Sequence, residues 1–254
     1  MDFSLILVIL TSVAGIIWVL EVLYRRVIRS DAGLEPSENL VVEYSRSFLP
    51  VLMLVLVVRS FMYEPFRIPS SSMVPTLLVG DFIFVNKFTY GLRLPVVHSK
   101  ILDIGEPERG DVMVFRLPSD PSVNYIKRLV GLPGDTIVVM NKRLSINTEL
   151  VALERNGLFV RPGRSAALLA VEQLGDVSHQ VLLEPMQSSR EGTFVVPEGH
   201  YFMMGDNRDN SQDSRYPQVG FVPQENVVGK AVRIWMNWDF PSAPKWQRIA
   251  TKVQ

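Results

Sequence analysis

The chain has 254 residues, a length that fits one or two domains, and 26 Lys and Arg residues balance 26 Asp and Glu residues. A formal net charge of zero gives no reason to expect a nucleic-acid partner or a strongly acidic one. The chain contains no cysteine, which excludes disulfides, a thiolate nucleophile and cysteine-based zinc sites.

The first predicted element is an apolar helix at residues 3–20, a stretch without a charged side chain. Its length approaches the ~20 residues that a bilayer requires. A cleavable signal peptide is the alternative, but such a peptide has a basic start and a small-x-small cleavage site, whereas this chain begins Met1-Asp2. We therefore predict an uncleaved transmembrane helix at residues 1–23.

A basic loop is predicted at residues 24–47, between this stretch and the next apolar one. Its basic side chains are Arg25, Arg26, Arg29 and Arg46. Because no Lys or Arg precedes the first apolar stretch, the positive-inside rule places the loop in the cytoplasm and the N-terminus outside.

The second apolar stretch, at residues 48–63, predicts another transmembrane helix. A helix of this length covers ~24 Å of the ~30 Å hydrocarbon core, and the side chains of Arg59 and Tyr63 can extend to the far interface. A re-entrant helix or a buried core helix is the alternative. If the helix spans the bilayer, everything from Glu64 onward lies outside the cytoplasmic membrane.

From residue 81 the pattern changes to short runs rich in Val, Ile and Phe, separated by Gly, Pro and Asp. Such spacing predicts a mainly β fold with antiparallel strands and without βαβ units. The predicted strands are Asp81–Val85, Asp111–Phe115, Tyr125–Val130, Thr136–Met140, Gln180–Leu183, Thr193–Val196 and Val227–Trp235. Residues 64–140 and 193–254 are expected to form a β-rich core, and the more polar residues 141–192 an inserted β subdomain.

Aromatic residues are dense near the end of the chain: Trp235, Trp238, Phe240 and Trp246. They belong either to a packed core or to a surface that dips into the membrane interface.

Three consecutive serines occur within residues 68–80, which read IPSSSMVPTLLVG. Pro69 and Pro75 keep this segment out of a regular helix or an inner strand. Small hydroxyls and free backbone N–H groups on an irregular segment are what a nucleophile and its oxyanion hole require. A polar turn after a membrane anchor is the alternative.

A lysine is the best candidate for a base, because HExxH, Walker A and GxSxG motifs are missing and the three histidines, His98, His179 and His200, are scattered. Lys127 lies in a predicted strand, and period-two alternation gives it the same face as Tyr125 and Leu129.

An apolar environment lowers the pKa of a lysine by disfavouring its charged form. At an ordinary pKa of ~10.4, only about one lysine in 2,500 is neutral at pH 7. Lowering that pKa to near 7 costs about 4–5 kcal/mol, which the fold must supply. The alternatives are that Lys127 is a solvated strand lysine, or that the equally placed Lys87 is the base.

The densest polar motif is GDNRDNSQDSR at residues 205–215. It does not fit a calcium loop, which requires a mid-loop glycine and a glutamate at the twelfth position. It is either a solvated loop or a hydrogen-bonded network that holds a catalytic base in place.

Four motifs in this order resemble the bacterial type I signal peptidases (leader peptidases), in their Gram-negative form with two membrane spans. The motifs are IPSSSMVPTL at 68–77, RGDVMVF at 109–115, YIKRLVGLPGD at 125–135 and GDNRDNSQDSR at 205–215. The likeness covers nearly all of residues 40–140 and 193–238, and four ordered motifs of this length are highly specific.

The resemblance implies a role for each matching residue. It implies that Ser72 is the nucleophile and that Lys127 is its general base. It also implies an oxyanion hole formed by the Ser70 hydroxyl and the Ser72 N–H, and an orientation of the lysine amine by Ser211. The implied supporting ion pairs are Asp213–Arg215 and Asp206–Arg128. The implied substrate pockets, which accept small side chains, are lined by Phe66, Ile68, Pro69, Met73, Leu77, Ile83, Val114, Tyr125 and Ile126.

The implied activity is that of a membrane-anchored serine endopeptidase that removes signal peptides from exported preproteins after a small-x-small motif. The reaction would pass through an ester intermediate and use no metal or cofactor. The implied location is the bacterial inner membrane, with a β-rich catalytic domain on the periplasmic side and the protein export machinery as a neighbour. The rival interpretations are a self-cleaving Ser-Lys regulator of related fold and a non-catalytic membrane-anchored adaptor.

Overall fold

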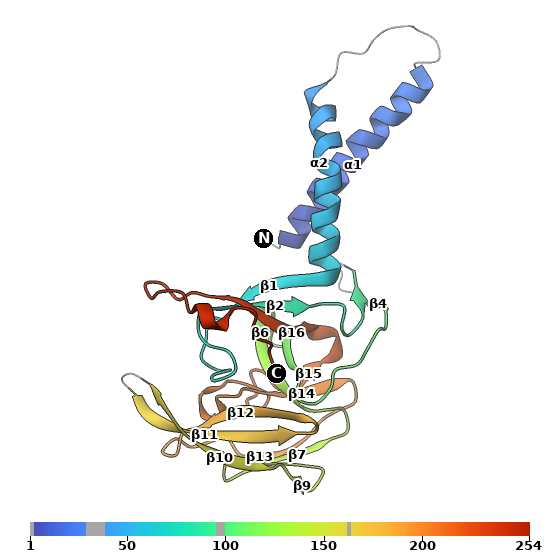
Figure 1. Cartoon of the computed structure of the whole chain (residues 1–254). Coiled ribbons are helices and arrows are strands. Elements are labelled where there is room, and N and C mark those ends of the chain that lie inside the picture. The colour runs from blue at the N-terminus through green and yellow to red at the C-terminus, as the bar shows by residue number, and fades with distance from the viewer. Residues whose placement is uncertain (1–2, 29–38, 95–99, 162–163) are drawn as a thin grey trace. The chain divides into compact units, whose positions relative to one another are not determined.

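The computed structural model describes residues 3–28, 39–94, 100–161 and 164–254, which form two units (Figure 1). The first unit is Met1–Tyr63 with Leu92–Leu102, and the second is Glu64–Gly91 with Asp103–Gln254.

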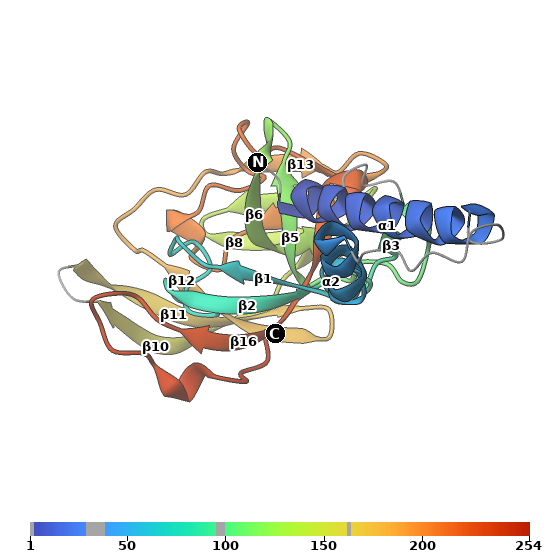
Figure 2. The same cartoon turned by 90° about the horizontal axis from the view of Figure 1, so that it is seen from above.

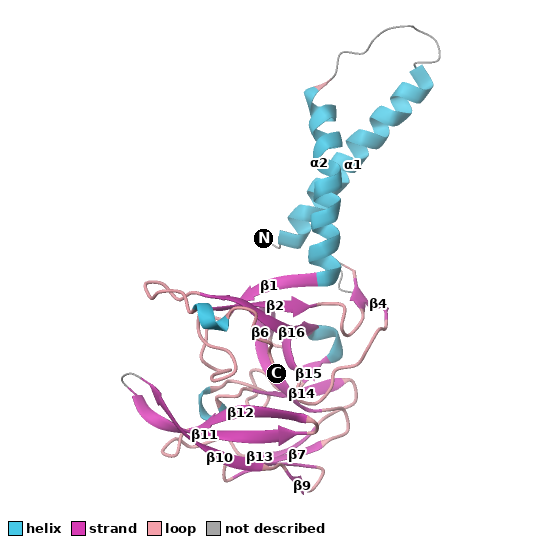
Figure 3. Cartoon of the chain, in the orientation of Figure 1, coloured by secondary structure: helices cyan, strands magenta, loops and turns pink. Residues whose placement is uncertain are grey.

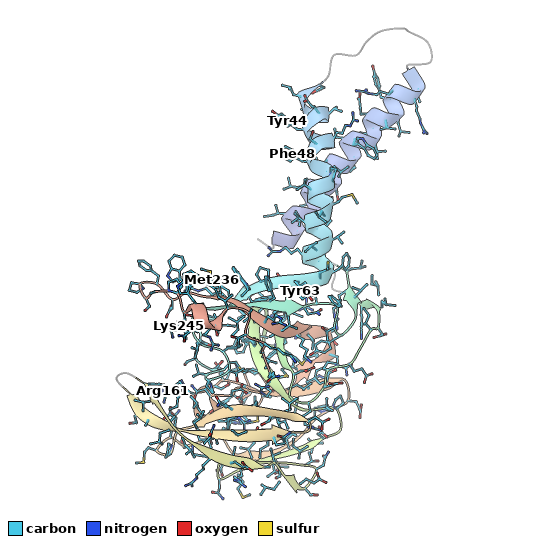
Figure 4. The ribbon with its side chains drawn as sticks, in the orientation of Figure 1. Tyr44, Phe48, Tyr63, Arg161, Met236 and Lys245 are labelled. Atoms are coloured by element: carbon cyan, nitrogen blue, oxygen red, sulfur yellow. The ribbon has the colours of Figure 1, made fainter. Side chains whose placement is uncertain are left out.

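The first unit is built from two apolar helices, α1 (Phe3–Ile28) and α2 (Leu40–Val57), and one turn of π-helix, η1 (Val58–Met62). Two short strands, β3 (Leu92–Arg93) and β4 (Lys100–Leu102), pair antiparallel in the same unit. Figure 4 shows the side chains along α2, where the rings of Tyr44 and Phe48 stack with centroids 6.1 Å apart.

Both helices are long and apolar enough to cross a membrane, over Leu5–Val27 and Leu40–Met62, with 23 residues each. None of the residues of α2 is buried, which does not fit the alternative of a core helix. Twenty-three residues of helix cover ~34 Å, so this segment exceeds the hydrocarbon thickness without help from its flanking side chains.

The helix boundaries differ from those predicted from the sequence. Helix α2 begins at Leu40, ahead of the predicted start at residue 48, because the Asn39 side chain accepts a hydrogen bond from the Val41 N–H and caps the helix. Helix α1 continues to Ile28. The predicted loop at 24–47 is shortened from both sides, and its residues 29–38 lie outside the described residues.

The second unit contains a seven-stranded sheet in the order β1-β2-β16-β5-β6-β14-β15, of which Figure 2 labels β1, β2, β16, β5 and β6. Its strands are β1 (Tyr63–Arg67), β2 (Asp81–Asn86), β16 (Val227–Asn237), β5 (Val112–Leu117), β6 (Asp120–Gly131), β14 (His200–Met204) and β15 (Val222–Pro223). Within the described sheets, every pair with a defined register is antiparallel. The predicted mainly β fold is confirmed.

Two further sheets lie between β6 and β14 in the sequence (Figure 3). One has four strands in the order β13-β7-β8-β9, namely β13 (Gly192–Val195), β7 (Thr136–Met140), β8 (Arg143–Ile146) and β9 (Glu149–Leu150). The other has three, β10 (Leu153–Arg161), β11 (Arg164–Leu174) and β12 (Val177–Leu183), in that order. We call these two sheets the added sheets.

The added sheets extend beyond the predicted insertion at 141–192, because they also include β7 and most of β13, which the sequence predicts to be core strands. The reason is local: Asn141 and Lys142 have φ of 49° and 59°, the positive values of a two-residue hairpin turn, so β7 folds back directly onto β8. Strand β13 then pairs with the other edge of β7.

One hydrophobic cluster fixes the segment that carries the three serines. Ile68, Met73 and Leu77 of that segment are buried against Val114 of β5 and Ile126 of β6. The segment that carries the three serines therefore packs against β5 and against β6, the strand that contains Lys127.

The aromatic residues near the end of the chain are on the surface. Trp235, Trp238, Phe240 and Trp246 are all exposed, Phe240 by 80%. Trp235 also stacks on Phe84, with ring centroids 5.7 Å apart. Of the two alternatives from the sequence, core packing is therefore wrong, and a surface role is left.

Candidate active site

Ser72 lies in a short irregular segment between β1 and β2. The segment is closed at its ends by hydrogen bonds from the Ile68 N–H to the Asp81 carbonyl (2.8 Å) and from the Gly80 N–H to the Ile68 carbonyl (2.9 Å). A single helical turn follows Ser72, in which the Leu77 N–H donates to the Met73 carbonyl (2.9 Å). Because Met73 and Leu77 point into the core, Ser72 is fixed at the start of this turn.

The structure brings Ser72 and Lys127 together. The Lys127 Nζ donates a hydrogen bond to the Ser72 Oγ at 2.8 Å and another to the Ile126 carbonyl at 2.9 Å. Lys127 is 4% exposed and Ser72 is 8% exposed. The amine also lies 5.2 Å from the centre of the Tyr125 ring, in agreement with the predicted common face of β6.

The surroundings of Lys127 suit it to accept a proton. Burial lowers the pKa of Lys127 from 10.5 to about 8, and the negative charges of Asp213 and Asp206 limit this decrease. At a pKa of about 8, roughly one lysine in ten is neutral at pH 7, compared with one in thousands for an ordinary lysine. A serine hydroxyl therefore has a usable base within hydrogen-bond distance.

Ser70 lies next to the same hydroxyl. The Ser70 Oγ is 3.3 Å from the Ser72 Oγ, and Ser70 is on the exposed side of the segment. A hydroxyl at this place can donate to an oxygen that develops negative charge on a substrate carbonyl attacked by Ser72.

Both ion pairs expected in the 205–215 loop are present and buried. The guanidinium of Arg128 donates to both oxygens of Asp206, at 2.8 and 2.7 Å, and that of Arg215 donates to both oxygens of Asp213, at 2.8 and 2.9 Å. Burial raises the pKa of Asp206, but the Arg128 charge outweighs it and holds that pKa below its ordinary value. Asp206 is therefore negatively charged, and it pairs with Arg128, the residue directly after Lys127.

Ser211 is buried near the site without a direct bond to the lysine. Its Oγ has no hydrogen-bond partner among the described residues. Gly205 explains its location, because a Cβ at Gly205 would lie 2.2 Å from the Ser211 Oγ and 2.6 Å from the Ser72 carbonyl oxygen. The absence of a side chain at Gly205 is therefore what allows Ser211 to approach the nucleophile segment, a requirement that sequence reasoning missed.

Sequence reasoning also missed two asparagines of the same loop. The Asn207 N–H donates to the Ser72 carbonyl at 3.0 Å, and its Nδ2 donates to the Ser71 carbonyl at 3.0 Å. The Nδ2 of Asn210 donates to the Ser71 Oγ at 3.2 Å. The loop therefore holds the backbone on both sides of the nucleophile.

The residues predicted to line substrate pockets are mostly in one place. Seven of the nine are in or against the hydrophobic cluster around Met73: Phe66, Ile68, Met73, Leu77, Ile83, Val114 and Ile126. Tyr125 packs against a neighbouring cluster and Pro69 is exposed. Their contact with a substrate stays a prediction.

The other candidate bases lie elsewhere. Lys87 forms an ion pair with Glu64 at 3.2 Å, and His200 is half-buried, with its Nδ1 2.9 Å from the Glu198 carbonyl oxygen. His179 is buried beside Glu172, and His98 lies outside the described residues. Among the described residues, the hydrogen bonds of the Ser72 hydroxyl are to Lys127 and Ser70.

The sequence is similar to those of known proteins. The family model described as signal peptidase, peptidase S26, matches residues 41–236. Signal peptidase I of Pseudomonas fluorescens is 49% identical over 279 residues and that of Pseudomonas aeruginosa 48% identical over 280 residues, each alignment covering 98% of both chains. A crystal structure of a signal peptidase I from Enterococcus faecalis is 31% identical, covers 50% of this chain and 98% of its own, and has a TM-score of 0.32.

Proposed function

Because this chain belongs to the signal peptidase family, peptidase S26, we propose that it cleaves exported preproteins after a small-x-small motif by means of a Ser72–Lys127 dyad. Family membership itself makes the chain a serine endopeptidase that acts in signal-peptide removal. The observation that supports the dyad is the 2.8 Å hydrogen bond between the Lys127 Nζ and the Ser72 Oγ.

In the first proposed step, the neutral amine of Lys127 accepts the proton of the Ser72 hydroxyl. The Ser72 oxygen attacks the carbonyl carbon at the end of the signal peptide, and the oxygen of that carbonyl takes the negative charge. The Ser70 hydroxyl and the Ser72 N–H donate hydrogen bonds to that oxyanion. The protonated Lys127 then gives its proton to the leaving amine, and an ester remains on Ser72.

In the second proposed step, Lys127 accepts a proton from a water molecule, which attacks the ester. The oxyanion collapses, the signal peptide leaves with a free carboxyl group, and Ser72 recovers its proton from Lys127. We propose that Ser211 orients the amine, because its hydroxyl is buried without a hydrogen-bond partner among the described residues and lies against Gly205, next to the nucleophile segment. No metal or cofactor takes part in these steps.

Selection of small side chains is proposed to come from the cluster around Met73. Met73, Leu77 and Ile83 of this cluster are fully buried, and we propose that the substrate recess beside Ser72 is therefore shallow. A shallow apolar recess accepts alanine-like side chains and excludes larger ones by volume.

The chain is an inner-membrane protein by its family and its two apolar helices. We place the N-terminus and the catalytic domain on the periplasmic side, because Arg25 and Arg26 occupy the last turn of α1 and favour a cytoplasmic location for that end. The exposed aromatic residues near the end of the chain then contact the membrane interface, and the export machinery supplies the substrates.

Sealed inside-out inner-membrane vesicles that contain the full chain test the activity and the orientation together. A preprotein added outside such vesicles is expected to stay intact until detergent opens them, and then to be cut once. Mass spectrometry of the product should place the cut after a small-x-small end. Cleavage at the same rate in intact vesicles that do not import the preprotein would contradict the orientation, and a cut after bulky residues would contradict the motif.

The rival interpretations fit less well. A non-catalytic adaptor is excluded by membership of a peptidase family. A self-cleaving regulator carries a DNA-binding domain where this chain has two apolar helices.

A further inference from the structure

The 205–215 loop is bound from two sides. On one side it contacts the nucleophile and the base: the Asn207 N–H binds the Ser72 carbonyl, and Asp206 binds Arg128, the residue after Lys127. On the other side it contacts the added sheets, which the proposed mechanism does not use. What those sheets contribute to the reaction is therefore open.

The strongest contact on that second side is a buried ion pair. Arg208 donates through Nη1 to the Glu172 Oε1 at 2.6 Å and through Nη2 to the Glu172 Oε2. Glu172, on β11, is 2% exposed and Arg208 is 5% exposed, so both charges are buried almost completely. A two-point bond between a carboxylate and a guanidinium fixes both distance and orientation.

Backbone contacts reinforce this ion pair. The Leu182 N–H of β12 donates to the Asp206 carbonyl at 2.8 Å, and Leu182 forms a parallel bridge with Asn207. His179 of β12 lies opposite Glu172 in the sheet register, with its Nε2 3.5 Å from Glu172 and 3.8 Å from Asp206. The three-stranded sheet therefore lies directly against the residues that precede Arg208.

A second ion pair holds the next residue of the loop. The Lys142 Nζ, from the β7–β8 turn, donates to the Asp209 carboxylate at 2.7 Å, and that carboxylate also accepts the Glu184 N–H at 2.7 Å. Arg208 and Asp209 share one turn of 3-10 helix. Both added sheets therefore hold the same turn.

We propose that Glu172 is a positioning residue for signal-peptide cleavage, acting through Arg208 on the 205–215 loop and so on the Ser72 carbonyl. The chain of contacts is short, because Arg208 directly follows Asn207, whose N–H holds that carbonyl. Without the Glu172 charge, Arg208 is buried without its counter-ion and the turn moves to hydrate it. This inference rests on the proposed Ser72–Lys127 dyad.

The test uses the full-length enzyme in detergent with a preprotein substrate. Glu172→Gln keeps the shape of the side chain and removes its charge. We expect kcat to fall about 10- to 100-fold, the scale of loss for a displaced reacting group, with KM unchanged. A merely structural contribution would lower only the fraction of folded enzyme and leave the kcat of the folded fraction intact.

Asp135→Asn is the matched control. Asp135 is buried and forms an ion pair in the same unit with the half-buried Arg109 at 2.9 Å, and its hydrogen bonds go to residues outside the 205–215 loop. This variant likewise removes the charge of a buried carboxylate paired with an arginine, and its kcat per folded molecule is expected to equal that of the wild type.

A double-mutant cycle with Arg208→Met separates the proposed route from others. Glu172→Gln should cause no further loss in the Arg208→Met background, since its effect passes through that arginine.

If Glu172→Gln does not fold, Glu172→Asp keeps the charge with a shorter reach and should give an intermediate kcat. A wild-type kcat in Glu172→Gln or Glu172→Asp would overturn the inference. A change in KM alone, or additive losses in the double-mutant cycle, would also overturn it. Activity in Ser72→Ala would instead overturn the proposed dyad.

Discussion

Replacing Lys127 with methionine is expected to lower kcat for preprotein cleavage by about 10⁴-fold or more, and Ser72→Ala should do the same. Without the amine, the Ser72 hydroxyl has no acceptor for its proton, since its other described hydrogen-bond neighbour is the Ser70 hydroxyl at 3.3 Å. Because nucleophile and base act as a unit, the double variant should be no worse than either single one. The measurement is the rate of cleavage by purified variants at saturating preprotein.

Lys87→Met is the matched control for this substitution. Lys87 pairs with Glu64, and the described hydrogen bonds of the Ser72 hydroxyl are to Lys127 and Ser70, so the variant should retain near-wild-type kcat. A large loss in Lys87→Met, with activity kept in Lys127→Met, would show that the wrong lysine has been assigned.

The inactive Lys127→Met variant should also be more stable than the wild type. The pKa of Lys127 is lower in the folded state, about 8, than its ordinary value of 10.5, so protonation favours the unfolded chain. The destabilisation, roughly 3 kcal/mol, is fully present below pH 8 and disappears as the pH rises towards 10.5. Loss of activity with a raised Tm at pH 7 would therefore separate a chemical role from unfolding.

The second large effect concerns the buried ion pair between Arg128 and Asp206. Asp206→Ala should lower the free energy of unfolding by about 3–5 kcal/mol, because it leaves the fully buried guanidinium of Arg128 without its counter-ion. Thermal unfolding of the detergent-solubilised chain measures the loss.

Glu64→Ala provides the comparison for Asp206→Ala. It breaks the Lys87–Glu64 pair, whose side chains are partly exposed, and should cost no more than about 1 kcal/mol. Equal destabilisation by the two substitutions would refute the claim that burial makes the Arg128–Asp206 pair important.

Much of the core and of the site could be predicted from the sequence, because those features have local signals. Short runs rich in Val, Ile and Phe predicted seven of the strands, and period-two alternation predicted the common face of Tyr125 and Lys127; these lie as expected. The start of α2 was misplaced because Glu43 and Arg46 hide the apolar character of its first turns, whereas the Asn39 cap marks the true start.

Contacts between distant segments could not be predicted in the same way. Nothing near Glu172 in the sequence indicates that its partner is Arg208, since their pairing depends on how β11 packs against the 205–215 loop. The need for glycine at position 205 is also invisible locally, because the atoms that exclude a Cβ belong to Ser211 and Ser72. The sequence does not reveal that β7 and β13 belong to an added sheet, because the pattern of a strand does not indicate which sheet the strand joins.

The pH dependence of single-turnover cleavage, measured where the chemical step limits the rate, tests most directly whether an uncharged Lys127 accepts the Ser72 proton. Since burial lowers the pKa of Lys127 to about 8, the rate should rise about tenfold per pH unit below that value and become constant above it. A rate that stays flat from roughly pH 6 to 9 would contradict an uncharged amine as the base.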